Sequence, residues 1–136
     1  MKENLIHYRT CVCNINYHMV WSVKYRRKIL SAEVEAYLQE LVQEIAEDKG
    51  FTVQLFECEE GDHVHCFVSA PPKLSITAIM KYLKGISGRK LFERFPEIRN
   101  QLWKGELWNH SYYVETVGSV SEENIRRYIE HQSKAY

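Results

Sequence analysis

Residues 62–68 read DHVHCFV, and the alternation within this stretch decides how the fold is arranged. Successive side chains of a β-strand point to opposite faces, so His63 and His65 share one face. The other face takes three apolar side chains, those of Val64, Cys66 and Val68. We therefore expect a strand over residues 63–69 whose apolar face is covered by helices and whose two imidazoles stand together on the open face.

The residues before this stretch predict two strands with a helix between them. Residues 10–25 alternate like a strand, and one face collects Ile15, Tyr17, Met19, Trp21 and Val23. Residues 31–49 carry apolar side chains at helical spacing, with Ser31 able to cap the start and Gly50 able to end the helix. Residues 51–57 favour a second strand with three apolar residues in phase, namely Phe51, Val53 and Leu55.

The residues after this stretch predict two more helices and one more strand. An apolar stripe over residues 75–92 indicates a helix, which a basic connector at 93–106 follows. Residues 110–117 favour a strand, and residues 118–119 read Gly-Ser, typical of a flexible link. A short final helix is expected over residues 121–134, because a capping serine precedes two glutamates in its first turn.

The resulting order of elements, β-α-β-β-α-β and then a last helix, defines the expected fold class. It is α+β: a ferredoxin-like, antiparallel four-stranded sheet with two helices on one face, plus the C-terminal helix. A chain of 136 residues fits one domain, so we expect residues 1–136 to form a single unit. Apolar residues make up 45% and aromatic residues 12%, which excludes disordered and collagen-like classes.

Apolar runs and cysteines bear on the compartment. No run of 18 apolar residues occurs, and no apolar signal core follows residues 1–4, so we expect a cytoplasmic protein without a membrane span. The four cysteines form no Cys-x-x-Cys pair: Cys11, Cys13, Cys58 and Cys66. Cys11 and Cys13 would share a strand face, but no second pair completes a zinc site, so reduced apolar thiols are the favoured interpretation.

Charge is balanced overall and polarised along the chain. The formal net charge is zero, yet residues 31–60 hold nine acids and one base, whereas residues 73–104 hold eight bases and two acids. A second basic cluster lies at residues 24–28. One acidic and one basic side suggests a polyanionic partner, although ordinary solvated helix faces explain the same pattern.

The paired histidines and the end of the chain together suggest a chemistry. Two imidazoles at i, i+2 can bind a divalent metal, whereas the alternative is two half-exposed histidines on a sheet surface. Tyr128 and Gln132 are four residues apart on the last helix and share a face, the alternatives being a packing aromatic and a surface amide. Only about one tyrosine in a thousand is phenolate at pH 7, so a tyrosine nucleophile needs a Lewis acid. His63, His65 and Gln132 holding a metal near Tyr128 would meet that need.

Four ordered segments resemble the HUH endonuclease superfamily, and most closely its single-tyrosine transposases, which move insertion sequences as single-stranded DNA. They span nearly the whole chain and read YHMVWSVKYR at 17–26, DHVH at 62–65, LWNHSYY at 107–113 and YIEHQ at 128–132. The resemblance implies that His63, His65 and Gln132 bind Mg²⁺ or Mn²⁺. It also implies that Tyr128 cleaves one strand, keeps the 5′-phosphate as phosphotyrosine, releases a 3′-OH and later rejoins strands.

The same resemblance implies partners. The family acts as a homodimer on subterminal DNA hairpins, and its tyrosine helix can complete the active site of the partner subunit. Basic residues of the two clusters are candidates for contacts with DNA phosphates: Lys24, Arg26, Arg27, Lys28, Lys81, Lys84, Arg89 and Lys90.

Three other functions remain open from the sequence. A domesticated relative that serves chromosomal repeats would share every motif. A two-histidine phosphoesterase needs two His-x-Ser/Thr motifs, and this chain offers only residues 131–133. A non-catalytic ferredoxin-like module that binds nucleic acid would not need Tyr128.

Overall fold

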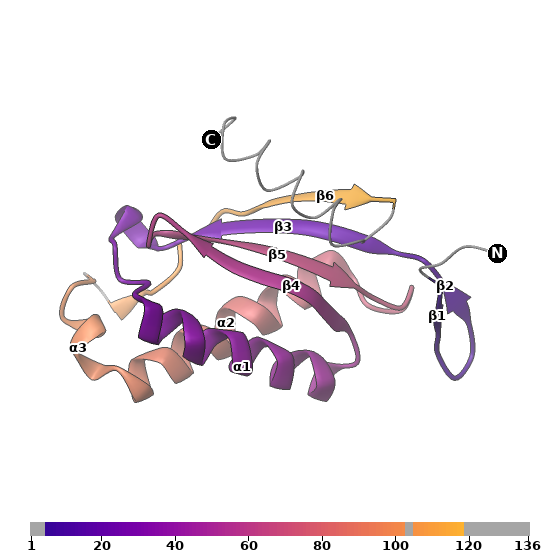
Figure 1. Ribbon diagram of the computed structural model, residues 1–136, viewed down its shortest axis with the longest axis horizontal. Coiled ribbons are helices and arrows are strands. Elements are labelled where there is room, and N and C mark those ends of the chain that lie inside the picture. The colour runs from indigo at the N-terminus through magenta and orange to yellow at the C-terminus, as the bar shows by residue number, and fades with distance from the viewer. Residues whose placement is uncertain (1–4, 103–104, 119–136) are drawn as a thin grey trace.

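A four-stranded antiparallel sheet forms the centre of the computed structural model, which describes residues 5–102 and 105–118 (Figure 1). Its strands lie in the order β4-β5-β3-β6. Their bounds are Asn16–Ser22 for β3, Thr52–Glu59 for β4, His63–Ser69 for β5 and Tyr113–Val117 for β6. Every neighbouring pair is antiparallel, which confirms the predicted ferredoxin-like arrangement.

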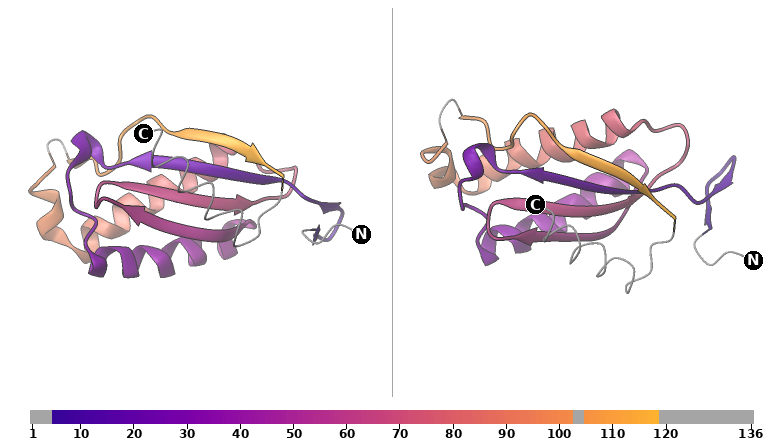
Figure 2. Two further views of the ribbon diagram at one scale, coloured as in Figure 1. Left: turned by 45° about the horizontal axis from the view of Figure 1, so that its top comes forward. Right: turned by 90° about the horizontal axis from the view of Figure 1, so that it is seen from above.

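Two long helices cover one face of the sheet and leave the other face without a described helix (Figures 1 and 2). Helix α1 (Ala32–Lys49) begins at Ser31, whose side chain accepts from the Val34 N–H, and ends at Gly50 in the left-handed region (φ 85°). Helix α2 (Ile76–Arg94) begins at Ser75 and is followed by the short α3 (Pro96–Arg99). The expected helix at 121–134 lies outside the described residues.

The core lies between the helices and the sheet face that they cover. Odd residues of β3 and even residues of β5 point into it, as the alternation predicts, and Met19, Trp21 and Val64 are at most 2% exposed. Leu38 from α1 and Leu83 from α2 are fully buried against them. Cys66 belongs to this core, and burial raises the pKa of its thiol. None of the described helices is long and apolar enough to cross a membrane.

A β-bulge in β4 makes one prediction wrong. The pairing of β4 with β5 shifts between Val53 and Leu55, so Leu55 leaves the core face and Phe56 takes its place there. Beyond the bulge every side chain of β4 lies on the face opposite to the one that simple alternation predicts. Glu57 is therefore paired with His65, and Glu59 with His63, on the sheet face that carries the histidines.

The bounds of two other strands also differ from the predicted ones. The predicted strand over 10–25 is divided: β2 (Val12–Cys13) pairs with β1 (Ile6–His7) in a separate hairpin, and β3 begins at Asn16. A 3-10 turn, η1 (Lys24–Arg26), follows β3. The strand expected over 110–117 begins only at Tyr113, because the preceding residues leave the ladder beside β3.

Candidate metal centre and nucleic-acid surfaces

His63 and His65 share the face of β5 that α1 and α2 do not cover, and both aim Nε2 at one oxygen of Glu59. The distances to Glu59 Oε2 are 3.1 Å from His63 and 2.8 Å from His65. One ligand atom from each of these three residues lies within 4.8 Å of the others. The side chains are 8% and 0% exposed, so these are buried imidazoles and not half-exposed surface histidines. Gln132, the expected third ligand, lies outside the described residues.

Asp62 holds the ring of His63 in place. Its Oδ1 lies 2.7 Å from His63 Nδ1, while Oδ2 lies 3.1 Å from the ammonium of Lys28. Burial alone would raise the pKa of Asp62, but the hydrogen bonds from His63 and Lys28 outweigh it and bring the pKa below its ordinary value. The ionised carboxylate favours the proton of His63 on Nδ1, which leaves Nε2 as the atom that can bind a metal.

His18, on the neighbouring strand β3, supports His65 in the same way. Its Nε2 lies 3.0 Å from His65 Nδ1, its ring stacks on Phe67 at 4.4 Å, and its Nδ1 lies 3.5 Å from Glu115 Oε1. Burial, together with the charge of His65, lowers the pKa of His18 to about 4 against the opposing effect of Glu115. Burial likewise lowers the pKa of His65, so both rings are neutral at pH 7.

This donor set fits a divalent cation. Neutral imidazole is the form that binds metals, and two imidazole nitrogens with one carboxylate oxygen suit ions such as Mn²⁺. Each imidazole that faces Glu59 is also oriented through its other nitrogen, as metal-binding histidines usually are. A second group of residues, Glu60, Asp62 and His63, also brings three ligand atoms together. Asp62 in that group is already paired with Lys28.

Sequence reasoning missed three residues of this cluster, and each had a different signal. Asp62 directly precedes His63 in the sequence, so a contact between its carboxylate and that imidazole could have been predicted. His18 is a polar residue within the central strand β3, and its alternation with Met19 placed it on the open face. Glu59 had no local signal, because the bulge near Val53 alone brings it to this face.

The candidate DNA contacts of residues 24–28 are mostly paired with acids. Lys24 Nζ lies 2.6 Å from Glu106, and Lys28 and Arg26 lie 3.1 and 3.8 Å from Asp62. Arg27 is exposed. Lys28 and Arg26 thus lie beside the carboxylate that orients His63 in the candidate metal centre.

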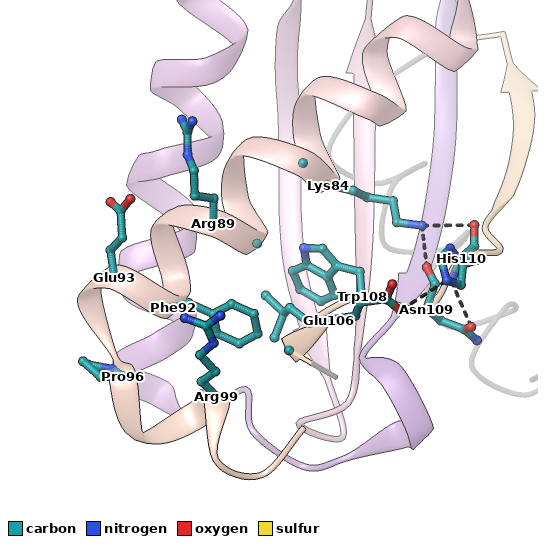
Figure 3. Close-up of a pocket in the computed structure, with 14 residues that line it drawn as sticks. Lys84, Arg89, Phe92, Glu93, Pro96, Arg99, Glu106, Trp108, Asn109 and His110 are labelled. Atoms are coloured by element: carbon teal, nitrogen blue, oxygen red, sulfur yellow. Dashed lines mark hydrogen bonds and ion pairs between the residues drawn. The ribbon is translucent and has the colours of Figure 1, made fainter. Parts of the chain in front are cut away.

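The candidates on α2 divide into exposed cations and one structural lysine. Lys81, Arg89 and Lys90 are exposed. Lys84 instead turns its ammonium toward the backbone carbonyl of Asn109, 2.5 Å away, as Figure 3 shows. Burial lowers its pKa.

A groove of about 790 Å³ lies beside α2 and α3 (Figure 3). Arg89 and Arg99 border it together with the aromatic rings of Phe92 and Trp108, and the Arg99 guanidinium lies 5.8 Å from the Phe92 ring centre. Gly88 of α2 faces Trp108, whose Cδ1 would lie 3.6 Å from a Cβ there. Cations and aromatic rings are the groups that bind phosphates and bases of single strands.

A ferredoxin-like sheet with a candidate divalent-cation centre on the face opposite to α1 and α2 defines the class of this protein. The family described as "Transposase IS200 like" matches residues 11–132. The chain belongs to this family, which confirms the resemblance seen in the ordered motifs and identifies the chain as a transposase of the insertion-sequence type.

Two individual relatives named as transposases match most of the chain. The chain is 40% identical over 124 residues to the ISDra2 transposase TnpA of Deinococcus radiodurans, covering 91% of this chain and 88% of the relative. It is 35% identical over 119 residues to the transposase for insertion sequence element IS200 of Salmonella typhimurium, covering 88% and 77%.

Two solved structures are similar. A putative transposase from Deinococcus radiodurans R1 has a TM-score of 0.74 and 36% identity, with 93% of this chain and 97% of that chain covered. A REP-associated tyrosine transposase bound to a REP hairpin has a TM-score of 0.57 and 13% identity, with 91% and 68% covered. The second similarity supports the fold alone.

Proposed function

We propose that this chain is a metal-dependent single-strand DNA transposase whose nucleophile is Tyr128. The observation that carries the proposal is the convergence of His63 Nε2 and His65 Nε2 on one oxygen of Glu59. Support also comes from the extent of the family match, which reaches residue 132 and so includes both Tyr128 and Gln132.

The reaction is a transesterification. The Tyr128 oxygen attacks the phosphorus of one phosphodiester, a tyrosine–phosphorus bond forms, and the bond from phosphorus to the 3′-oxygen breaks. The phenol proton is lost and the leaving 3′-oxygen gains a proton, so the products are a 5′-phosphotyrosine and a free 3′-OH. Attack of a 3′-OH on the phosphotyrosine rejoins strands and restores the tyrosine, which requires neither water nor ATP.

A bound Mg²⁺ or Mn²⁺ would supply positive charge that polarises the phosphate and stabilises the charge developing in the transition state. His63, His65 and Gln132 would hold it, and Glu59 adds a carboxylate that the sequence did not predict. Asp62 orients His63, and His18 orients His65. Burial keeps His65 neutral and therefore ready to bind a cation.

We further propose the partners of this activity. A similar structure holds a REP hairpin, and the family moves insertion sequences, so DNA hairpins at the ends of a mobile element are the proposed substrate. The proposed working form is a homodimer of single-domain chains, residues 1–136, in which the tyrosine helix acts in cis or in trans. The exposed cations Arg27, Lys81, Arg89 and Lys90 are the proposed phosphate contacts.

The decisive experiment incubates the full chain with an end-labelled single-stranded hairpin oligonucleotide and Mn²⁺. We expect a covalent protein–DNA adduct that EDTA prevents and that Tyr128→Phe abolishes. Tyr37→Phe is the matched control, because Tyr37 lies on α1, which covers the sheet face opposite to the histidines, and packs against Phe95; it should form the adduct like the unaltered chain. DNA binding without any adduct would favour the non-catalytic module, and an adduct that persists in Tyr128→Phe would assign the nucleophile to another tyrosine.

A further inference from the structure

The ladder between β3 and the segment leading into β6 is interrupted beside the histidines. Val20 pairs with Tyr113, and Val23 forms a bridge with Trp108. Between these pairings, two residues of β3 face four residues of the other segment, 109–112. Asn109 N still donates to Ser22 O at 2.9 Å, so the extra length is taken up after Asn109, where the chain bows away from β3.

Lys84 of α2 fixes the bowed segment. Its ammonium lies 2.5 Å from the carbonyl oxygen of Asn109, 3.3 Å from that of His110 and 3.5 Å from that of Ser111; Figure 3 shows this lysine reaching the segment from α2. The same ammonium lies 5.7 Å from the ring centre of Tyr112. One half-buried cation thus holds three successive carbonyls, and it fixes the backbone that presents Tyr112.

The interruption opens a cavity of about 320 Å³ against the candidate metal centre. His63 forms part of its wall, together with Arg26, Asn109, Ser111, Tyr112 and Tyr113. The two tyrosines are 39% and 38% exposed, large aromatic side chains that the fold leaves partly uncovered.

Arg26 is held at this cavity by an unusual backbone. Tyr25 and Arg26 both have positive φ, 60° and 54°, in the left-handed region that non-glycine residues rarely adopt. The Arg26 guanidinium lies 3.8 Å from Asp62 Oδ1, the same oxygen that orients His63. A cation, two aromatic rings and an amide therefore surround a space that reaches a candidate metal ligand.

We propose that this cavity binds one nucleotide of the DNA strand, the nucleotide next to the phosphate that is cleaved. Its volume is at the lower end of the roughly 300–1,000 Å³ of small-molecule sites. Tyrosine rings stack bases of any sequence, arginine pairs with phosphate, and an asparagine amide can read a base edge. The inference rests on the proposed function, because it places the nucleotide beside the cation centre at which that function puts the phosphate.

The test measures binding of the pentanucleotide dT5 to the full chain carrying Tyr128→Phe, in EDTA, so that neither cleavage nor metal contributes. We expect Tyr112→Ala to weaken binding about tenfold, since a stacked base is lost, and Tyr112→Phe to bind like the parent. The matched control is His7→Ala: His7 is an exposed ring on β1, and it borders neither this cavity nor the groove beside α2. It should change binding less than twofold.

A second measurement leaves every side chain of the cavity intact. Pentanucleotides containing 5-iodouracil, irradiated on the same chain, should crosslink to Tyr112 or Tyr113, as peptide mass spectrometry would show. Equal binding by all variants with crosslinks elsewhere, or a larger effect of His7→Ala than of Tyr112→Ala, would overturn the inference. If hairpin DNA forms a covalent adduct but the Tyr112 variants change neither the adduct nor dT5 binding, this inference alone is contradicted. If dT5 binds through Tyr112 but no adduct forms, the proposed function alone is contradicted.

Discussion

His18 Nε2 lies 3.0 Å from His65 Nδ1, and this contact joins the two central strands β3 and β5 behind the candidate metal centre. When a cation occupies the Nε2 lone pair of a neutral His65, the remaining proton of that ring is on Nδ1. His18 Nε2 is then the acceptor that holds the ring in orientation. Burial keeps the pKa of His18 near 4, so it remains an acceptor at neutral pH.

Substitution of His18 should therefore weaken metal binding without unfolding the protein. We expect His18→Phe to lower the affinity for Mn²⁺ by about 10- to 100-fold, the usual effect of losing an outer-shell partner. Phenylalanine keeps the stack on Phe67 but cannot accept a hydrogen bond. His18→Gln supplies an amide oxygen as acceptor and should retain more of the affinity. Calorimetric titration measures the Mn²⁺ affinity of both variants. If His18→Phe bound Mn²⁺ as tightly as the unaltered chain, the contact between His18 and His65 would contribute to packing alone.

Two neighbouring glutamates distinguish the two possible metal groups. Glu59→Gln removes the carboxylate on which both Nε2 atoms converge, and we expect Mn²⁺ affinity to fall at least about tenfold. Glu60→Gln is the matched control, because Glu60 is exposed and its group depends on an Asp62 already paired with Lys28. Both variants are titrated with Mn²⁺. A larger loss of affinity in Glu60→Gln than in Glu59→Gln would place the ion in the group that contains Glu60.

Metal binding should also stabilise the fold. Free Mn²⁺ at 100 times its dissociation constant should raise the free energy of unfolding by about 2.7 kcal/mol, since only the folded chain brings the ligands together. The same concentration should leave His63→Ala nearly unchanged. Urea unfolding with Mn²⁺ and with EDTA measures the difference, and an equal gain in the variant would place the stabilising ion elsewhere.

Lys84 and Lys81, one turn apart on α2, should differ in what they contribute. Lys84→Met loses the hydrogen bonds to the carbonyls of residues 109–111, and we expect the free energy of unfolding to fall by about 1.5–3 kcal/mol. Lys81→Met removes the same charge from an exposed position and should change stability by less than about 0.5 kcal/mol. Urea denaturation compares them. Equal stabilities would mean that Lys84 is available for DNA like its neighbour.

Much of the fold was predictable because its signals are local. The caps Ser31 and Gly50 lie beside the helix that they begin and end, and each satisfies backbone groups within one turn. The alternation of residues 63–69 assigned Val64, Cys66 and Val68 to the core, and all three lie there, whereas Phe67 lies on the histidine face under the ring of His18. The roles of Tyr128 and Gln132 stay predictions, since both lie outside the described residues.

The chain alone predicted that His63 and His65 share a face, because a strand has a period of two residues and β5 has no bulge between them. Only the tertiary structure decided what surrounds them. Pairing with β5 creates the bulge near Val53, and a shift of one residue turns Glu59 toward the imidazoles. The register of β3 against β5 likewise brings His18 to His65. Such contacts join residues far apart along the chain, so no short stretch of sequence contains them.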